Sequence, residues 1–389
     1  MSTPGNFYCS EKFTWLSVDL EKRQQFSCCA ALPAKIDLSW LKDNAGQLFN
    51  TKHLQQERQQ MLDNIPVASC EGPCWNPERN NLVSRRNILQ SHVKTHSDIN
   101  VDTPEQYHIM LGSTCNLTCS YCCKQYSSAW LKDIVDNGSY MDRDRFNLNK
   151  LDLVMSKISQ SEHSRSSGFQ SLLNELTAFE NVKEIYITGG EPLLYNEFPE
   201  LINRLSDRNN SNIIFYSGLG VNSTRFRSQL SKIKNTSAIK MYISAECCDK
   251  LYEFNRYGNT WDNFLINLQE VVKQGFKFEF SCVLSNLTIF GFAEFLKQFP
   301  DVTIKHEFCG DPDFLNVNVL DDTSKEIICT AINQSNFEFK DTILSAISRT
   351  CTNEQKQDLT VYLKQFANRR NISLDVFPLS FRTWINDEN

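Results

Sequence analysis

Three cysteines lie close together in the first third of the chain. They form the run Cys115-Asn-Leu-Thr-Cys119-Ser-Tyr-Cys122, with three and then two residues between them. Thiolates at this spacing can bind one inorganic cluster, and a cubane iron–sulfur cluster has four irons, so one iron would keep an open coordination position. An open position lets a metal centre activate a ligand, whereas protein ligands close a structural site. The run therefore predicts a reaction site.

A second motif lies further along the chain. Residues 182–188 alternate like a β-strand and run into Gly189-Gly190-Glu191-Pro192. Adjacent glycines let the backbone approach a ligand closely, and a carboxylate can accept hydrogen bonds from an ammonium group. Each motif follows an expected strand, which favours a shared function over coincidence.

The cysteine spacing, with Tyr121 directly before the third cysteine, resembles the signature of the radical S-adenosylmethionine (SAM) enzymes. The second motif resembles the GGEP motif of the same superfamily. This resemblance implies that Cys115, Cys119 and Cys122 hold a [4Fe-4S] cluster whose free iron chelates SAM. It also implies reductive cleavage of SAM to methionine and a 5′-deoxyadenosyl radical, which abstracts hydrogen from a substrate.

The resemblance implies further contacts to SAM. A polar pair at the end of the fourth predicted strand, Ser244 and Glu246, would reach the ribose hydroxyls, although Cys247-Cys248 then departs from the Ser-x-Asp-Gly of related enzymes. Arg256 would lie near the SAM carboxylate, which a guanidinium matches bidentately. The expected cofactor-binding residues are Tyr121, Gly189, Gly190, Glu191, Ser244, Glu246 and Arg256.

Strands and helices alternate through the middle of the chain, which predicts an α/β fold with parallel strands and crossover helices. The predicted strands are 107–112, 184–188, 212–216, 239–245, 276–284 and 302–308. Six such units resemble the partial (β/α)6 barrel of the radical SAM superfamily, with the chemistry at the C-terminal ends of the strands. We assign this barrel to residues 101–315 and a helical C-terminal extension to residues 316–389, in which no motif stands out.

A second group of cysteines lies in residues 1–100. Their order, with an aromatic-rich hairpin and a tight Cys70-Glu-Gly-Pro-Cys74 loop, resembles a SPASM or twitch auxiliary-cluster module placed before the barrel. The resemblance implies that Cys9, Cys28, Cys70 and Cys74 bind a second [4Fe-4S] cluster, with Cys29 as the alternative to Cys28. Because the loop has three residues between its cysteines where two are common, a zinc site stays open here.

The alternative class is a zinc-stapled interaction protein without catalysis, in which both cysteine groups bind zinc. The first group would then need a fourth ligand, for which Cys123 and His108 are candidates. The remaining cysteines are expected to be small buried side chains, and Cys309, at the end of the sixth predicted strand, is the exception worth testing.

Composition limits the partners. The chain has 389 residues, a net charge of −6, fifteen cysteines and no run of five basic residues. This composition argues against bulk nucleic-acid binding. No basic leader with an apolar run and no membrane-length apolar stretch is present, so we expect a cytoplasmic protein. The expected partners are a small-molecule or peptide substrate and an electron donor, either a reductase or a flavodoxin or ferredoxin. The sequence predicts neither the substrate nor the oligomeric state.

Overall fold

The computed structural model describes residues 7–89, 96–143, 145–150, 152, 167–180, 182–208 and 211–387. The ends of the predicted N-terminal module and C-terminal extension, residues 1–6 and 388–389, lie outside this set. The fold is of the α/β class, with mostly parallel strands and helices packed on them, as predicted. The chain divides into two compact units: Met1–Gly112, Ser159–Phe215 and Ile233–Ile239 form the first, and Ser113–Ile158, Tyr216–Lys232 and Lys240–Asn389 form the second.

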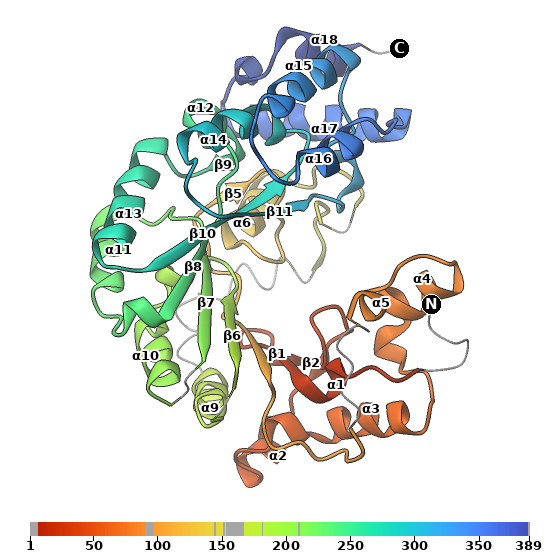
Figure 1. Ribbon diagram of the computed structural model, residues 1–389, viewed down its shortest axis with the longest axis vertical. Coiled ribbons are helices and arrows are strands. Elements are labelled where there is room, and N and C mark those ends of the chain that lie inside the picture. Colours follow the sequence, from red (N-terminus) through yellow and green to blue (C-terminus); the bar gives the residue numbers. More distant parts are fainter. Residues whose placement is uncertain are drawn as a thin grey trace. The chain divides into compact units, whose positions relative to one another are not determined.

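The strands of the first unit lie in the order β7-β6-β4-β1-β2-β3. Figure 1 labels β7, β6, β1 and β2 of these strands. β1, β4, β6 and β7 are parallel, and β2 and β3 are antiparallel at the edge. Part of the predicted N-terminal module therefore extends the same sheet as β4. The bounds are β1 Trp15–Asp19, β2 Gln24–Phe26, β3 Ala34–Lys35, β4 Gln106–Met110, β6 Glu184–Thr188 and β7 Asn212–Ser217.

Buried and half-buried residues alternate along β4 and β6, so the two faces of their sheet differ. Tyr107 and Ile109 on β4 are fully buried, and they pair in register with Ile185 and Ile187 on β6. The residues between them face the other way and are half-buried. One face is therefore apolar core, and the other carries polar side chains.

Helices of the first unit cover the apolar face. Phe198 on α10 meets Phe215 on β7 with ring centroids 5.1 Å apart, and Phe179, just after α9, meets Tyr107 at 5.5 Å. The helices of this unit are α1 Glu11–Thr14, α2 Leu38–Asp43, α3 Lys52–Leu62, α4 Asn76–Arg79, α5 Arg85–Leu89, α9 Ser167–Leu176 and α10 Phe198–Arg208.

In the second unit β8 (Ile239–Ile243), β10 (Lys277–Leu284) and β11 (Ile304–Phe308) run parallel in the order β11-β10-β8. A separate short ribbon pairs β5 (Thr118–Cys119) with β9 (Arg256–Tyr257) in the antiparallel sense. The helices are α6 Ser128–Asn137, α11 Ser223–Leu230, α12 Asp249–Asn255, α13 Trp261–Lys273, α14 Phe292–Gln298, α15 Asp322–Asn333, α16 Lys340–Ile347, α17 Asn353–Arg370 and α18 Leu379–Asn386.

The predicted elements of the barrel region agree closely with these bounds. α13 spans Trp261–Lys273 and is followed by Gly275, whose φ of 77° suits the turn that ends a helix. The segment 374–384 packs on other elements of the second unit. Phe377 lies 4.9 Å from Phe254 on α12, and Phe381 lies 5.2 Å from Phe290 between ring centroids. None of the helices in the described ranges is both long and apolar enough to cross a membrane.

Candidate active site

The loop that carries the three motif cysteines lies between β4 and α6. Its backbone is tied to the start of α6, because the Ser128 hydroxyl donates to the Cys115 carbonyl at 3.0 Å and accepts from the Cys115 N–H at 3.1 Å. Ser127, the N-cap of α6, donates to the Leu117 carbonyl at 2.6 Å. Further along, Cys119 pairs with Arg256 in the β5–β9 ribbon. The loop is therefore held at both ends.

The three thiols share one environment. Cys119 is buried, and Cys115 and Cys122 are half-buried. Burial raises the pKa of the Cys122 thiol well above its usual value, and the neighbouring thiols of Cys123, Cys119 and Cys115 add to the increase. Sulfur is the donor that an iron–sulfur cluster takes, as thiolates and with release of their protons.

An ion pair lies beside this loop. The Arg256 guanidinium donates to both oxygens of Glu246, from Nη2 to Oε1 at 2.6 Å and from Nε to Oε2 at 3.2 Å. The Tyr121 hydroxyl donates to Glu246 Oε1 at 2.7 Å and also contacts Arg256. Glu246 and Arg256 are buried. Tyr121, from the cysteine loop, thus joins residues of β9 and of the segment after β8.

The network places a fixed positive charge beside one of the cysteines. Arg256 Nη1 lies 3.9 Å from Cys119 Sγ. Although burial opposes its charge, Glu246 and the other neighbours raise the pKa of Arg256 well above its usual value. A cation at this distance stabilises a thiolate. Arg256 is therefore suited to stabilising the charged form of Cys119.

The sequence predicted separate SAM contacts for Glu246 and Arg256, whereas the structure joins the two side chains. Each oxygen of Glu246 already accepts from Arg256, and the Val283 N–H also donates to Oε1 at 3.2 Å. Ser244 is half-buried, and its N–H donates to the Ser217 carbonyl at 3.0 Å. The predicted contacts of these residues to SAM stay predictions.

The Gly-Gly-Glu-Pro motif forms a tight turn after β6 in the first unit. Gly189 and Gly190 have φ of 98° and 55°, in the left-handed region. A Cβ on Gly189 would lie 2.8 Å from the Gly112 carbonyl oxygen, so glycine is required by the approach of the turn to the end of β4. Glu191 is buried, and its Oε1 accepts from the Leu193 N–H at 3.3 Å. The capping contact orients this carboxylate.

The zinc alternative gains no support from this region. His108, a candidate fourth ligand, has Nε2 2.7 Å from Thr188 Oγ1 and Nδ1 3.3 Å from Ser17 Oγ, so both ring nitrogens are engaged within the sheet. Cys123 is buried with its sulfur 3.9 Å from Arg145 Nη1. Over the described ranges, no three His, Cys, Asp or Glu side chains are arranged as ligands of a single metal ion.

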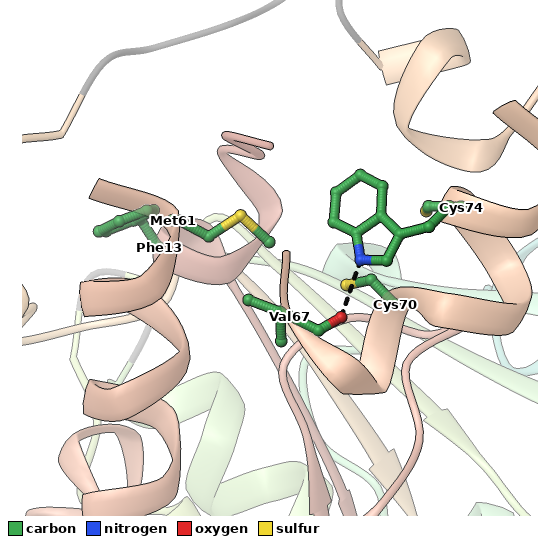
Figure 2. Close-up of a cluster of buried hydrophobic side chains, with 6 residues drawn as sticks. Phe13, Met61, Val67, Cys70 and Cys74 are labelled. Atoms are coloured by element: carbon green, nitrogen blue, oxygen red, sulfur yellow. Dashed lines mark hydrogen bonds between the residues drawn. The ribbon is translucent and has the colours of Figure 1, made fainter. Parts of the chain in front are cut away.

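The N-terminal cysteines of the first unit gather around an apolar cluster. Figure 2 shows Cys70 and Cys74 in this cluster, in which the Trp75 indole donates to the Val67 carbonyl at 2.8 Å. The buried members of the cluster are Phe13, Met61, Val67, Cys70, Cys74 and Trp75, and Cys9 packs against them. The fold thus brings Cys9 to the same apolar cluster as Cys70 and Cys74. These are three of the four predicted ligands, and their role as ligands stays a prediction.

The thiols of the N-terminal group interact with one another. Burial raises the pKa of Cys9 to about 12, and Cys28 and Cys70 contribute to the increase. Cys28 is buried, whereas the neighbouring Cys29 is exposed. A hydrogen bond with the Cys29 thiol lowers the pKa of Cys28. Cys28 also interacts with the thiols of Cys9, Cys70 and Cys74, which favours it over the exposed Cys29 as a ligand.

A buried ion pair beside this group was not predicted. The Lys12 ammonium lies 2.9 Å from Glu57 Oε2 and 3.0 Å from Ser69 Oγ, and Lys12 and Glu57 are buried. The Lys12 charge acts on both Cys28 and Cys70 to favour their thiolate forms. A lysine in the sequence next to Phe13 gives no signal of this role, because only the fold brings α1 against α3.

Comparison with known proteins supports the predicted class. Residues 109–298, just under half of the chain, match the sequence profile of the Radical SAM superfamily. This part of the chain is therefore similar to the superfamily, in agreement with the resemblance of the barrel region. The matched range begins after the N-terminal cysteines, so the auxiliary-cluster module stays a prediction. A search of curated proteins finds no significant match.

Several solved structures show weak similarity. "Native anSMEcpe with bound AdoMet" is 16% identical, with 68% of this chain and 60% of that chain covered and a TM-score of 0.35. Streptococcus suis SuiB bound to precursor peptide SuiA is 12% identical, with coverages of 94% and 71% and a TM-score of 0.34. Methylornithine synthase (PylB) is 14% identical, with coverages of 69% and 69% and a TM-score of 0.34. The chain thus spans about 60% of the length of the first of these proteins.

Proposed function

We propose that this protein is a radical SAM enzyme that binds a [4Fe-4S] cluster through Cys115, Cys119 and Cys122. The main support is that the three thiols lie in one braced loop within the matched range, with the Arg256 cation beside Cys119. When bound, the cluster and SAM supply one-electron reductive cleavage of SAM and hydrogen abstraction from a substrate. The protein itself binds, orients and shields these groups.

The surrounding residues have distinct proposed roles. The loop contacts hold the three sulfur atoms, and Arg256 offsets the negative charge that gathers on the thiolates. Glu191 would accept hydrogen bonds from the methionyl ammonium of SAM, and Gly189 and Gly190 would let the backbone approach it. Ser244 would bind the ribose, because its half-buried hydroxyl lies at the end of β8.

The Tyr121–Glu246–Arg256 network changes the roles proposed for its members. Because Arg256 already pairs with Glu246, we assign the pair first to holding the cysteine loop against β9 and the end of β8. Contacts of Glu246 to the ribose and of Arg256 to the SAM carboxylate are proposed in addition, through those hydrogen-bonding positions that the pair does not use.

We propose that Cys9, Cys28, Cys70 and Cys74 bind a second [4Fe-4S] cluster. Four protein ligands would close that cluster, so its role would be electron transfer or structure rather than SAM cleavage. The support is that Cys9, Cys70 and Cys74 lie at one apolar cluster of the first unit, and that the Cys28 thiol interacts with all three. The Lys12 cation also acts on Cys28 and Cys70. The substrate is a peptide or a small molecule, and the electron donor is a reductase, a flavodoxin or a ferredoxin.

Anaerobic reconstitution with iron and sulfide tests both clusters. The wild type should bind about eight irons per chain, four for each cluster. A variant with Cys115, Cys119 and Cys122 changed to Ala should keep about four, and a variant with Cys9, Cys28, Cys70 and Cys74 changed to Ala should also keep about four. Zinc in place of iron in the wild type would refute the enzyme proposal. If only the first variant binds less iron than the wild type, the second cluster is refuted and the first is not.

A further inference from the structure

The longest helix of the second unit, α17, has a buried face with two polar side chains on it. The helix starts at a capping box formed by Thr352 and Gln355 and ends at Asn371, whose φ is 49°. Its buried residues are Leu359, Tyr362, Leu363, Phe366, Ala367 and Arg370, at helical spacing. Buried polar groups need hydrogen-bond partners. The partners of Tyr362 and Arg370 therefore show which part of the protein α17 holds in place.

Tyr362 contacts the cysteine loop. It is fully buried, and its hydroxyl donates to the backbone carbonyl of Ser120, between the second and third motif cysteines. Its ring is held by aromatic neighbours with centroids 5.3 to 6.4 Å away. These neighbours are Trp130, Tyr140, Phe146, Phe314 and Phe366. The hydroxyl is therefore fixed where it meets the loop.

Arg370 makes a second contact two helical turns later. Its Nε donates to the Thr118 hydroxyl at 3.0 Å, directly before Cys119 in the loop. Its Nη1 donates to the Tyr140 hydroxyl at 2.6 Å, and Nη2 lies 3.4 Å from Asp133 Oδ2 on α6. Asp133 on α6 and the nearby Tyr140 thus fix one side of the guanidinium. Its other side donates to Thr118 of the cysteine loop.

The backbone of Cys119 and Ser120 is also held by α6 and α12. The Trp130 indole on α6 donates to the Cys119 carbonyl at 2.9 Å, and the Ser120 N–H donates to the Asn255 carbonyl at 2.8 Å. The contact from Tyr362 completes this set at the Ser120 carbonyl. Backbone groups of Cys119 and Ser120 are therefore fixed by α6, α12 and α17.

We propose that Tyr362 and Arg370 are positioning residues for the [4Fe-4S] cluster, so that α17 is part of the SAM-cleaving site. This inference rests on the proposed function. It assigns a role to the C-terminal extension, which carries no motif and lies beyond the matched range of the superfamily. The role is to fix the backbone around Cys119, so that its sulfur binds iron without reorganisation of the loop.

The test compares Tyr362→Phe with Thr360→Val. Both remove one hydroxyl of α17 that donates to a backbone carbonyl, but Thr360 donates to Ile385 in α18, at 2.9 Å. After anaerobic reconstitution, the rate of iron release to a chelator and the electron paramagnetic resonance spectrum of the reduced cluster, with and without SAM, are measured. Tyr362→Phe should release the cluster iron about tenfold faster, the factor equivalent to about 1.4 kcal/mol, and change the spectrum. Thr360→Val should match the wild type.

The outcomes separate the two proposals. A wild type that binds no iron at the motif cysteines would refute the proposed function. A wild type that binds iron, with Tyr362→Phe and Thr360→Val indistinguishable in release rate and spectrum, would refute the inference alone. If Tyr362→Phe does not fold, Thr118→Val takes its place in the comparison. This variant removes the hydroxyl of the loop that accepts a hydrogen bond from Arg370. Wild-type behaviour of Thr118→Val would then refute the inference.

Discussion

Glu246→Gln should strongly destabilise the protein even before any cluster is bound. The side chains of Glu246 and Arg256 are 0% and 4% exposed, and two hydrogen bonds join them. A glutamine in this position keeps the shape but leaves the Arg256 charge buried without a counter-charge. Breaking a buried pair from one side costs about 3–5 kcal/mol, far more than the median surface pair.

The assay is denaturant unfolding of the metal-free protein under reducing conditions. Glu294→Gln is the matched control, because Glu294 pairs with Lys297 on the surface of α14 with both side chains exposed. We expect a large shift of the unfolding midpoint for Glu246→Gln and almost none for Glu294→Gln. The double variant Glu246→Gln with Arg256→Met should recover part of the loss, since it removes the unpaired charge.

Two results would refute this reasoning. Equal, small shifts for Glu246→Gln and Glu294→Gln would mean that the Arg256 charge is not buried in the absence of its partner. Additive losses in the double variant would mean that the two side chains do not interact.

Three further predictions test other parts of the structure. Burial lowers the pKa of His108 from 6.5 to about 4, so the unfolded state binds the proton first and stability is lost as the pH falls below 6.5. Between pH 7.5 and 5 the loss of stability amounts to ~2 kcal/mol. Thermal unfolding of His108→Gln should lack that part of the pH dependence. Gly189→Ala should destabilise by more than about 1 kcal/mol, and by clearly more than Gly46→Ala in the same unfolding assay, because Gly46 shares the positive φ but has no atom within 4 Å of an added Cβ; equal losses would contradict the close approach to Gly112. Cys28→Ser should lose about half of the reconstituted iron while Cys29→Ser retains it, and the reverse would exchange the two ligands.

The regular elements around the motifs could be predicted because their patterns are local. Alternation over Glu184–Thr188 marks β6, and the apolar stripe and final glycine mark α13. The pairing of β1 with β4 could not be predicted, because every residue of β1 is buried and the sequence gives no register. Its contact depends on residues 91 positions apart, as in the Ser17–His108 pair.

The chemistry of the site could be predicted only where one segment contains it. The three motif cysteines lie in one loop, so their spacing alone predicts a shared cluster. The pairing of Arg256 with Glu246 was missed because each was expected to face SAM, and the fold turns them toward each other. The contact of Tyr362 with Ser120 joins residues 242 positions apart. Its only signal was a tyrosine on the apolar stripe of α17.

The central claim is that Cys119 and its neighbours hold a cluster that cleaves SAM. The most direct measurement is 5′-deoxyadenosine formed by the reduced, reconstituted protein with SAM under anaerobic conditions, in the wild type and in Cys119→Ala. We predict deoxyadenosine from the wild type and none from Cys119→Ala, with iron retained at the N-terminal site of the variant. Equal deoxyadenosine from both proteins, or none from an iron-loaded wild type, would contradict the account.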